Sequence, residues 1–120
     1  MPETPKRIEL RFFRTLSGNE PVREWLLELP DEDRRRIGID LATVEFGWPI
    51  GMPLCRAISS RRGLWEVRTD LSGGRIARVL FCVSDDRLHA LHGFIKKTQK
   101  TPDRDLDLAE KRMKELKRYE

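Results

Sequence analysis

The chain has 120 residues, 37% of them charged and 38% hydrophobic, enough for one packed core but not for two, so we expect residues 1–120 to form a single domain. Its net charge of +4 is uneven: residues 1–55 hold eight basic and ten acidic side chains, residues 56–100 ten basic and four acidic, and residues 101–120 six of each. No apolar run approaches membrane-spanning length and the first residues lack the apolar core of a signal peptide, which excludes a transmembrane protein and favours a cytoplasmic one.

The first third of the chain predicts one strand and two helices. Residues 6–16 alternate between apolar and polar side chains, which indicates a strand. Residues 21–29 begin with proline and place apolar side chains on one stripe, which predicts a short helix that Pro30 ends. A second helix should begin at the acidic residues from Asp31 and run to about Phe46. The two helices would form a hairpin that packs against a sheet.

Residues 47–63 form the longest irregular connection that we expect, because they hold several glycines and prolines and show little periodicity. Trp48 and Met52 are expected to pack beneath this loop, which we prefer to a role in stacking on bases. The second half of the loop is basic, with Arg56, Arg61 and Arg62.

Three consecutive antiparallel strands are predicted at residues 64–70, 75–83 and 88–95. Ser72-Gly73-Gly74 and Asp85-Asp86 have the composition of tight turns between them. A meander of this kind buries one face and leaves the other for polar groups. The polar residues of this region are Glu66, Arg68, Arg75, Arg78, His92, Lys96, Lys97 and Lys100.

A last helix should follow Thr101 and Pro102, which have the form of an N-cap and a proline at the first helical position. The order β-α-α-β-β-β-α then implies a small α+β domain with one mainly antiparallel sheet, a helix hairpin and a C-terminal helix. We expect the helices to lie on one side of the sheet and the first strand to pair within it.

The positive charge of residues 56–100 favours a partner rich in phosphates. A charge excess alone more often marks a solvated surface, but here the basic residues interrupt strands that could have been apolar. Cys55 and Cys82 lack CxxC spacing and histidine partners, which argues against disulfides and zinc. Gly-rich phosphate loops, nucleophile motifs and carboxylate clusters are also missing from the sequence. The remaining possibility is a cationic site without metal or cofactor.

Arginine and lysine can stabilise the charge that builds on phosphate during RNA transesterification, with the ribose 2′-hydroxyl as nucleophile. Proton transfer would require Glu66 or His92, or else Lys96 or Lys97 with a pKa lowered by neighbouring cations. Glu66 could instead pair with Arg68 or Arg78 across the strands. For His92 we prefer the role of a hydrogen-bonded core residue.

The segments LWEVR at 64–68, GRIARV at 74–79 and HGFIKKTQKTP at 92–102 resemble the HigB-like, phage-related branch of the RelE/ParE toxin superfamily. The resemblance covers nearly the whole chain, and the last segment is its most specific part. It implies a RelE-like fold and a toxin of a type II toxin–antitoxin pair. RelE-like members cut messenger RNA on the ribosome without a metal.

The resemblance implies that Arg68, Arg75 and Lys97 occupy the positions of cationic catalytic residues, and we add Glu66 to this set. The residues that we expect to bind RNA are Arg78, Lys96, Lys100, Arg61 and Arg62. The resemblance also implies a cognate antitoxin, a helix-turn-helix repressor that covers this site. The toxin would contact DNA only indirectly, through this antitoxin. No membrane partner is expected.

Two alternatives remain. ParE-like relatives of the same fold poison gyrase and do not cut RNA, although the grouping of Glu66, Arg68, Arg78 and Lys97 favours the ribonuclease. A non-catalytic module could also hold ribosomal RNA, DNA or a protein by charge alone. RelE-type enzymes often use a tyrosine near the end of the chain, and Tyr119, the only tyrosine here, lies at the far end of the predicted last helix.

Overall fold

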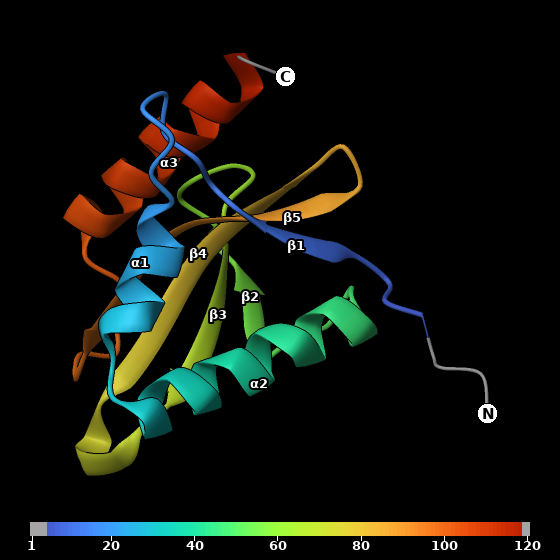
Figure 1. The fold of residues 1–120 in the computed structure, drawn as a ribbon. Helices are drawn as coiled ribbons and strands as arrows, with labels where there is room; N and C mark the ends of the chain where they lie inside the picture. The colour runs from blue at the N-terminus through green and yellow to red at the C-terminus, as the bar shows by residue number, and fades with distance from the viewer. Residues whose placement is uncertain (1–4, 119–120) are drawn as a thin grey trace.

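The computed structural model describes residues 5–118, and Figure 1 shows its helices and strands. Residues 1–4 and Tyr119 lie outside this range. In chain order the elements are β1 (Glu9–Phe12), α1 (Pro21–Glu28), α2 (Asp31–Gly47), β2 (Cys55–Ala57), β3 (Trp65–Asp70), a short 3-10 turn (Ser72–Gly74), β4 (Ile76–Ser84), β5 (Arg87–Lys96) and α3 (Asp103–Arg118).

The strands form one sheet in the order β1-β5-β4-β3-β2. All pairs are antiparallel except β1, which lies parallel to β5 at the edge, with Glu9 opposite Arg87. The predicted small α+β fold is confirmed, and so is the pairing of the first strand within the sheet. None of the helices within residues 5–118 has the length and apolarity needed to cross a membrane.

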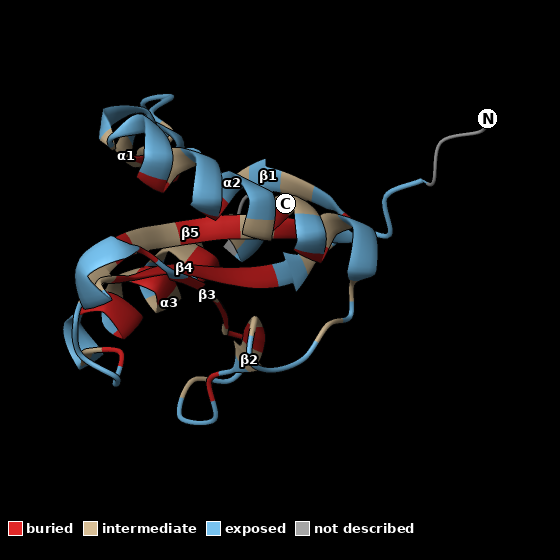
Figure 2. Cartoon of the chain, turned by 90° about the horizontal axis from the view of Figure 1, so that it is seen from below, coloured by how far each residue is buried: buried red, intermediate tan, exposed pale blue. Residues whose placement is uncertain are grey.

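The sheet is covered on both faces, which corrects the expectation that all helices lie on one side (Figures 1 and 2). On β4, Val79 and Phe81 belong to the core under α1 and α2, whereas Leu80 and Cys82 belong to a second core under α3. Burial continues along β4 from Ile76 almost to its end. A strand buried on both faces has a continuous apolar sequence, which differs from the prediction of a meander with one face free for polar groups.

The two predicted turns of the meander are present. Gly73 and Gly74 adopt φ values of 71° and 72°, which glycine reaches without steric cost. Asp85 and Asp86 adopt φ values of 55° and 58°, a region in which aspartate is among the better tolerated residues. These turns set the register that places residues of β3, β4 and β5 side by side.

The loop predicted at 47–63 contains the strand β2, whose three residues are too few to show an alternating pattern. Trp48 packs as predicted, edge to face against Trp65 and Phe81 with ring centroids 5.1 and 5.6 Å apart. The same prediction is wrong for Met52, whose side chain is 77% exposed. Because the loop crosses the edge of the sheet, Trp48 packs against the core while Met52 faces solvent.

Gly93 and Gly38 provide a matched test of the packing between α1 and β5. A Cβ on Gly93 would lie 2.3 Å from the Trp25 ring of α1, whereas one on Gly38 of α2 would meet no atom within 4 Å. We expect Gly93→Ala to lower the free energy of unfolding by about 2 kcal/mol or more. Gly38→Ala should raise it by up to about 1 kcal/mol because alanine favours the helix. Thermal unfolding measures both, and equal effects would contradict the packing described here.

Candidate functional site

Four charged side chains from neighbouring strands share the sheet face that also carries α3. Antiparallel pairing places Arg56 of β2 opposite Glu66 of β3, and Arg68 of β3 opposite Arg78 of β4. Residues two apart in a strand share a face, so all four side chains leave the sheet on the same side. The predicted polar alternation therefore brings Glu66, Arg68 and Arg78 together, and β2 adds Arg56.

Glu66 is the buried centre of this group, with no solvent exposure of its side chain. Its carboxylate accepts hydrogen bonds from Arg56 Nε, at 2.8 Å, and from the hydroxyl of Thr101. The Nε of Arg78 lies 3.3 Å away. The alternative that Glu66 pairs with Arg78 is thus confirmed, while Arg68 is bound elsewhere. The hydroxyl of Thr101, predicted to cap the last helix, anchors the helix approach to the sheet through Glu66.

Arg78 is fully buried and fixes the chain that follows β5. Its Nη2 donates to the backbone carbonyls of Thr98, at 2.5 Å, and Gln99, at 2.9 Å. Burial lowers the pKa of this guanidinium. Its Nε and Nη1 make no hydrogen bond with the described residues. A guanidinium with no exposed surface can act on a ligand only through the loop that it holds, residues 97–101.

The exposed cations of this face come from three segments. The side chain of Arg56 is 42% exposed, and that of Arg68 is half-buried with its Nη2 donating to Gln99 Oε1 at 2.7 Å. Lys100 is exposed and lines, together with Arg56, a cavity of about 230 Å³. Lys97 is exposed on the same loop, and no hydrogen bond or ion pair within residues 5–118 engages it. We refer to Arg56, Arg68, Lys97 and Lys100 as the cationic group.

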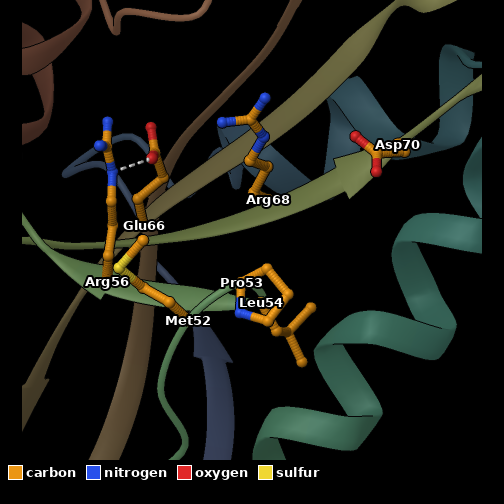
Figure 3. A pocket seen from close by; sticks show the side chains of 7 residues that line it. All are labelled: Met52, Pro53, Leu54, Arg56, Glu66, Arg68 and Asp70. Carbon is orange, nitrogen blue, oxygen red and sulfur yellow. Dashed lines mark hydrogen bonds and ion pairs between the residues drawn. The ribbon is translucent and has the colours of Figure 1, made fainter.

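A cavity of about 260 Å³ opens next to Arg68 (Figure 3). In Figure 3 the Arg56 and Glu66 side chains lie side by side at one end, and Arg68 and Asp70 project from β3. The full lining is Met52, Pro53, Leu54, Arg56, Glu66, Arg68 and Asp70. Two cations, two carboxylates and an apolar wall therefore meet in one open pocket.

Arg75 is not part of this group. Its guanidinium makes two hydrogen bonds to the buried Asp33 of α2, at 2.7 and 3.0 Å, on the opposite face of the sheet. The hydrogen bonds from Arg75 lower the pKa of Asp33 below its ordinary 3.8. The pair therefore stabilises the fold above that pH, and its contribution is lost as the pH falls through the lowered pKa. This contact holds the β3–β4 turn against α2.

His92 and Lys96 are held by α3. His92 Nε2 lies 2.7 Å from one oxygen of Asp105, and Lys96 Nζ donates to the other at 3.2 Å. Burial lowers the pKa of His92, although the hydrogen bond with Asp105 opposes this. Burial would raise the pKa of Asp105, but the bonds to His92 and Lys96 lower it. The predicted hydrogen bonding of His92 is confirmed, but the residue lies at the margin of the core, with its side chain 16% exposed.

The two predicted arginines of the loop before β3 differ from each other. Arg61 Nη1 lies 2.6 Å from Asp107 and 3.5 Å from Glu110 of α3, so acidic groups already balance its charge. The hydrogen bond to Asp107 raises the pKa of Arg61 further. Arg62 is exposed. Of this pair, only Arg62 presents an uncompensated charge to solvent.

Arg56, Asp70 and Thr101 belong to the site although the sequence does not predict them there. In the sequence Arg56 is one of several basic residues in a predicted loop, and its role depends on β2, which is too short to show a periodic pattern. Tyr119 lies outside the described residues. Within residues 5–118 no group of three or more His, Cys, Asp or Glu side chains has an arrangement that could hold a metal ion.

Comparison with known protein families matches residues 24–114 to the family described as "Phage derived protein Gp49-like (DUF891)". The matched range begins within α1 and ends within α3, and it includes the cationic group and Glu66. A search of curated proteins finds no match.

Proposed function

Because the chain belongs to the Gp49-like family of phage-derived proteins, a RelE/HigB-type toxin family of toxin–antitoxin systems, we propose that it is a metal-independent endoribonuclease that cuts messenger RNA on the ribosome and so inhibits translation. The observation that carries this proposal is that Arg56 and Arg68 lie beside the buried Glu66 on one sheet face, where loop 97–101, which holds Lys97 and Lys100, is hydrogen-bonded to Glu66 and Arg78. We also propose that the protein belongs to the HigB-like branch of this family and that residues 1–120 form a single domain.

In this mechanism Arg68 and Lys97 contact the scissile phosphate. Developing negative charge on its oxygens is stabilised by guanidinium and ammonium groups that are already in place. Arg68 is held by Gln99 on one side, which reduces the freedom that it would lose on binding. The ribose 2′-hydroxyl of the substrate attacks the adjacent phosphate and forms a 2′,3′-cyclic phosphate, while the bond from phosphorus to the 5′-oxygen of the next nucleotide breaks. The 2′-hydroxyl proton passes to solvent water, and the departing 5′-oxygen takes a proton from water.

Glu66 and Arg78 act as positioning residues in this proposal. The Glu66 carboxylate accepts hydrogen bonds from Arg56 and Thr101 and so orients both side chains. Arg78 donates hydrogen bonds to the backbone carbonyls of Thr98 and Gln99. Both ends of loop 97–101 are thereby tied to the sheet. We propose that Arg56, Lys100 and Arg62 bind flanking phosphates of the RNA. Arg75, which is bonded to Asp33, supports the turn between β3 and β4.

Membership of a toxin family implies an antitoxin partner. We propose that this partner is a helix-turn-helix repressor that covers the cationic group, so that inhibition and RNA binding are mutually exclusive. The toxin would then meet DNA only through its antitoxin.

Induced expression in a bacterium tests the proposal. Growth and protein synthesis should stop within one generation, and new RNA 5′ ends should appear inside translated reading frames. A ParE-like action would instead leave messages intact and damage DNA. Normal growth with abundant folded protein would contradict a toxin of either kind.

A further inference from the structure

A groove beside Arg68 carries a feature that phosphate binding does not explain. The cavity of about 260 Å³ continues into a second one of about 330 Å³, which is lined by Asp40, Pro53, Leu54, Arg68 and Asp70. The two cavities share Pro53, Leu54, Arg68 and Asp70 and so form one space, which we call the edge groove. It exists because β2 pairs only with residues 65–67 of β3, which leaves the end of β3 uncovered.

The carboxylate of Asp70 is exposed in this groove. No hydrogen bond or ion pair engages it among the described residues. Arg68, two positions earlier on the same strand, donates instead to Gln99. An unneutralised carboxylate beside the cationic group repels phosphate, and it would weaken RNA binding if it faced only the sugar–phosphate backbone of the RNA. Asp70 favours RNA binding only where the RNA presents hydrogen-bond donors to its carboxylate.

The other walls of the groove suit a nucleobase. The exposed Met52 side chain, Pro53 and Leu54 form an apolar surface against which a flat ring can lie. Asp40 also lines the groove, and one of its oxygens accepts a hydrogen bond from Thr69 Oγ1 at 2.7 Å. The groove therefore combines an apolar wall with carboxylates, and Arg68 lies where the attached phosphate would be.

We propose that the edge groove binds a guanine base of single-stranded RNA and that Asp70 determines this specificity. The inference rests on the proposed RNA substrate. An ionised carboxylate only accepts hydrogen bonds. Guanine alone presents two neighbouring donors, N1–H and N2–H, on its Watson–Crick edge, so one carboxylate can bind both. Adenine, cytosine and uracil each place an acceptor next to their donor there, and that acceptor would face the carboxylate oxygen.

Binding of short RNA strands by fluorescence anisotropy tests this. The strands are all-uridine, or carry one central guanosine, inosine or adenosine, with 2′-methoxy groups throughout so that none can be cut. The wild-type protein should bind the guanosine strand about tenfold more tightly than the inosine strand, which lacks the N2 amine. Asp70→Asn should reduce this preference to within about twofold without weakening binding of the all-uridine strand.

Asp86→Asn is the matched control, because it removes the same charge from the turn at the opposite end of β4 and should keep the preference. All measurements use one salt concentration. Absence of binding, equal affinity for all strands, or a guanosine preference that survives Asp70→Asn overturns the guanine subsite. Cleavage of ribosome-bound message is a separate readout: cutting without base preference would leave the proposed function intact and remove only this subsite.

Discussion

Arg68→Ala should reduce the rate of RNA cleavage at least about a hundredfold, the usual cost of losing one group that stabilises transition-state charge. The same variant should unfold at nearly the wild-type temperature, because a half-exposed side chain on the sheet face contributes little to stability. Lys97→Ala should show the same loss of cleavage rate and the same near wild-type unfolding temperature. Single-turnover cleavage of programmed ribosomes, together with thermal unfolding, measures both properties.

Arg75→Ala provides the contrast within the same set of predicted residues. It leaves Asp33 buried without its partner, so the variant should melt at a lower temperature while its folded fraction still cuts RNA. A variant at position 68 that remains fully active, or an inactive but stably folded variant at position 75, would show that the site has been assigned to the wrong face of the sheet.

Glu66→Ala should be the most destabilising change in the site. It leaves the fully buried Arg78 without its carboxylate and releases Thr101, which together should cost about 3 kcal/mol and lower the melting temperature by about 10 °C. Cleavage should fall as well, because loop 97–101 loses one of its anchors. Chemical denaturation and the cleavage assay measure these effects.

Two further variants show whether the loss of stability in Glu66→Ala comes from the burial of this side chain or from its charge. Glu66→Gln keeps the size of the side chain and one accepting oxygen, although its amide nitrogen donates where the second oxygen accepted, and it should lose less stability than the alanine variant. Glu9→Ala breaks an ion pair with Arg11 in which both side chains are more than half exposed, and should change stability little. A Glu66→Ala variant that melts like Glu9→Ala would contradict the role of a buried anchor.

Local patterns were sufficient to predict most of the fold. The alternation on β3 and the turn residues after it gave the meander and the shared face of Glu66, Arg68 and Arg78. The proline breaks gave the helix hairpin. Two features depend on contacts that local sequence does not contain: β1 adds to the sheet in parallel with a strand some eighty residues later, and α3 covers the face that was expected to be free.

The roles of individual cations were harder to predict than their positions. An arginine in a strand is usually predicted to be exposed. Arg78 is nevertheless buried, because Glu66 and two backbone carbonyls compensate its charge. The partner of Arg75 lies on a helix far earlier in the sequence. Pairings of this kind depend on how the helices dock on the sheet, so a basic residue count alone does not separate structural cations from functional ones.

In the proposed mechanism the 2′-hydroxyl of the RNA attacks a phosphate held by Arg68 and Lys97. Analysis of product ends on ribosome-bound message, with ribose or 2′-deoxyribose at the scissile position, tests it most directly. Chelation would be less informative because ribosomes themselves need Mg²⁺. We expect products that end in a 2′,3′-cyclic phosphate or 3′-phosphate, and a deoxy substrate that binds but resists cutting. Cleavage of the deoxy substrate, or products with a free 3′-hydroxyl, would contradict the mechanism.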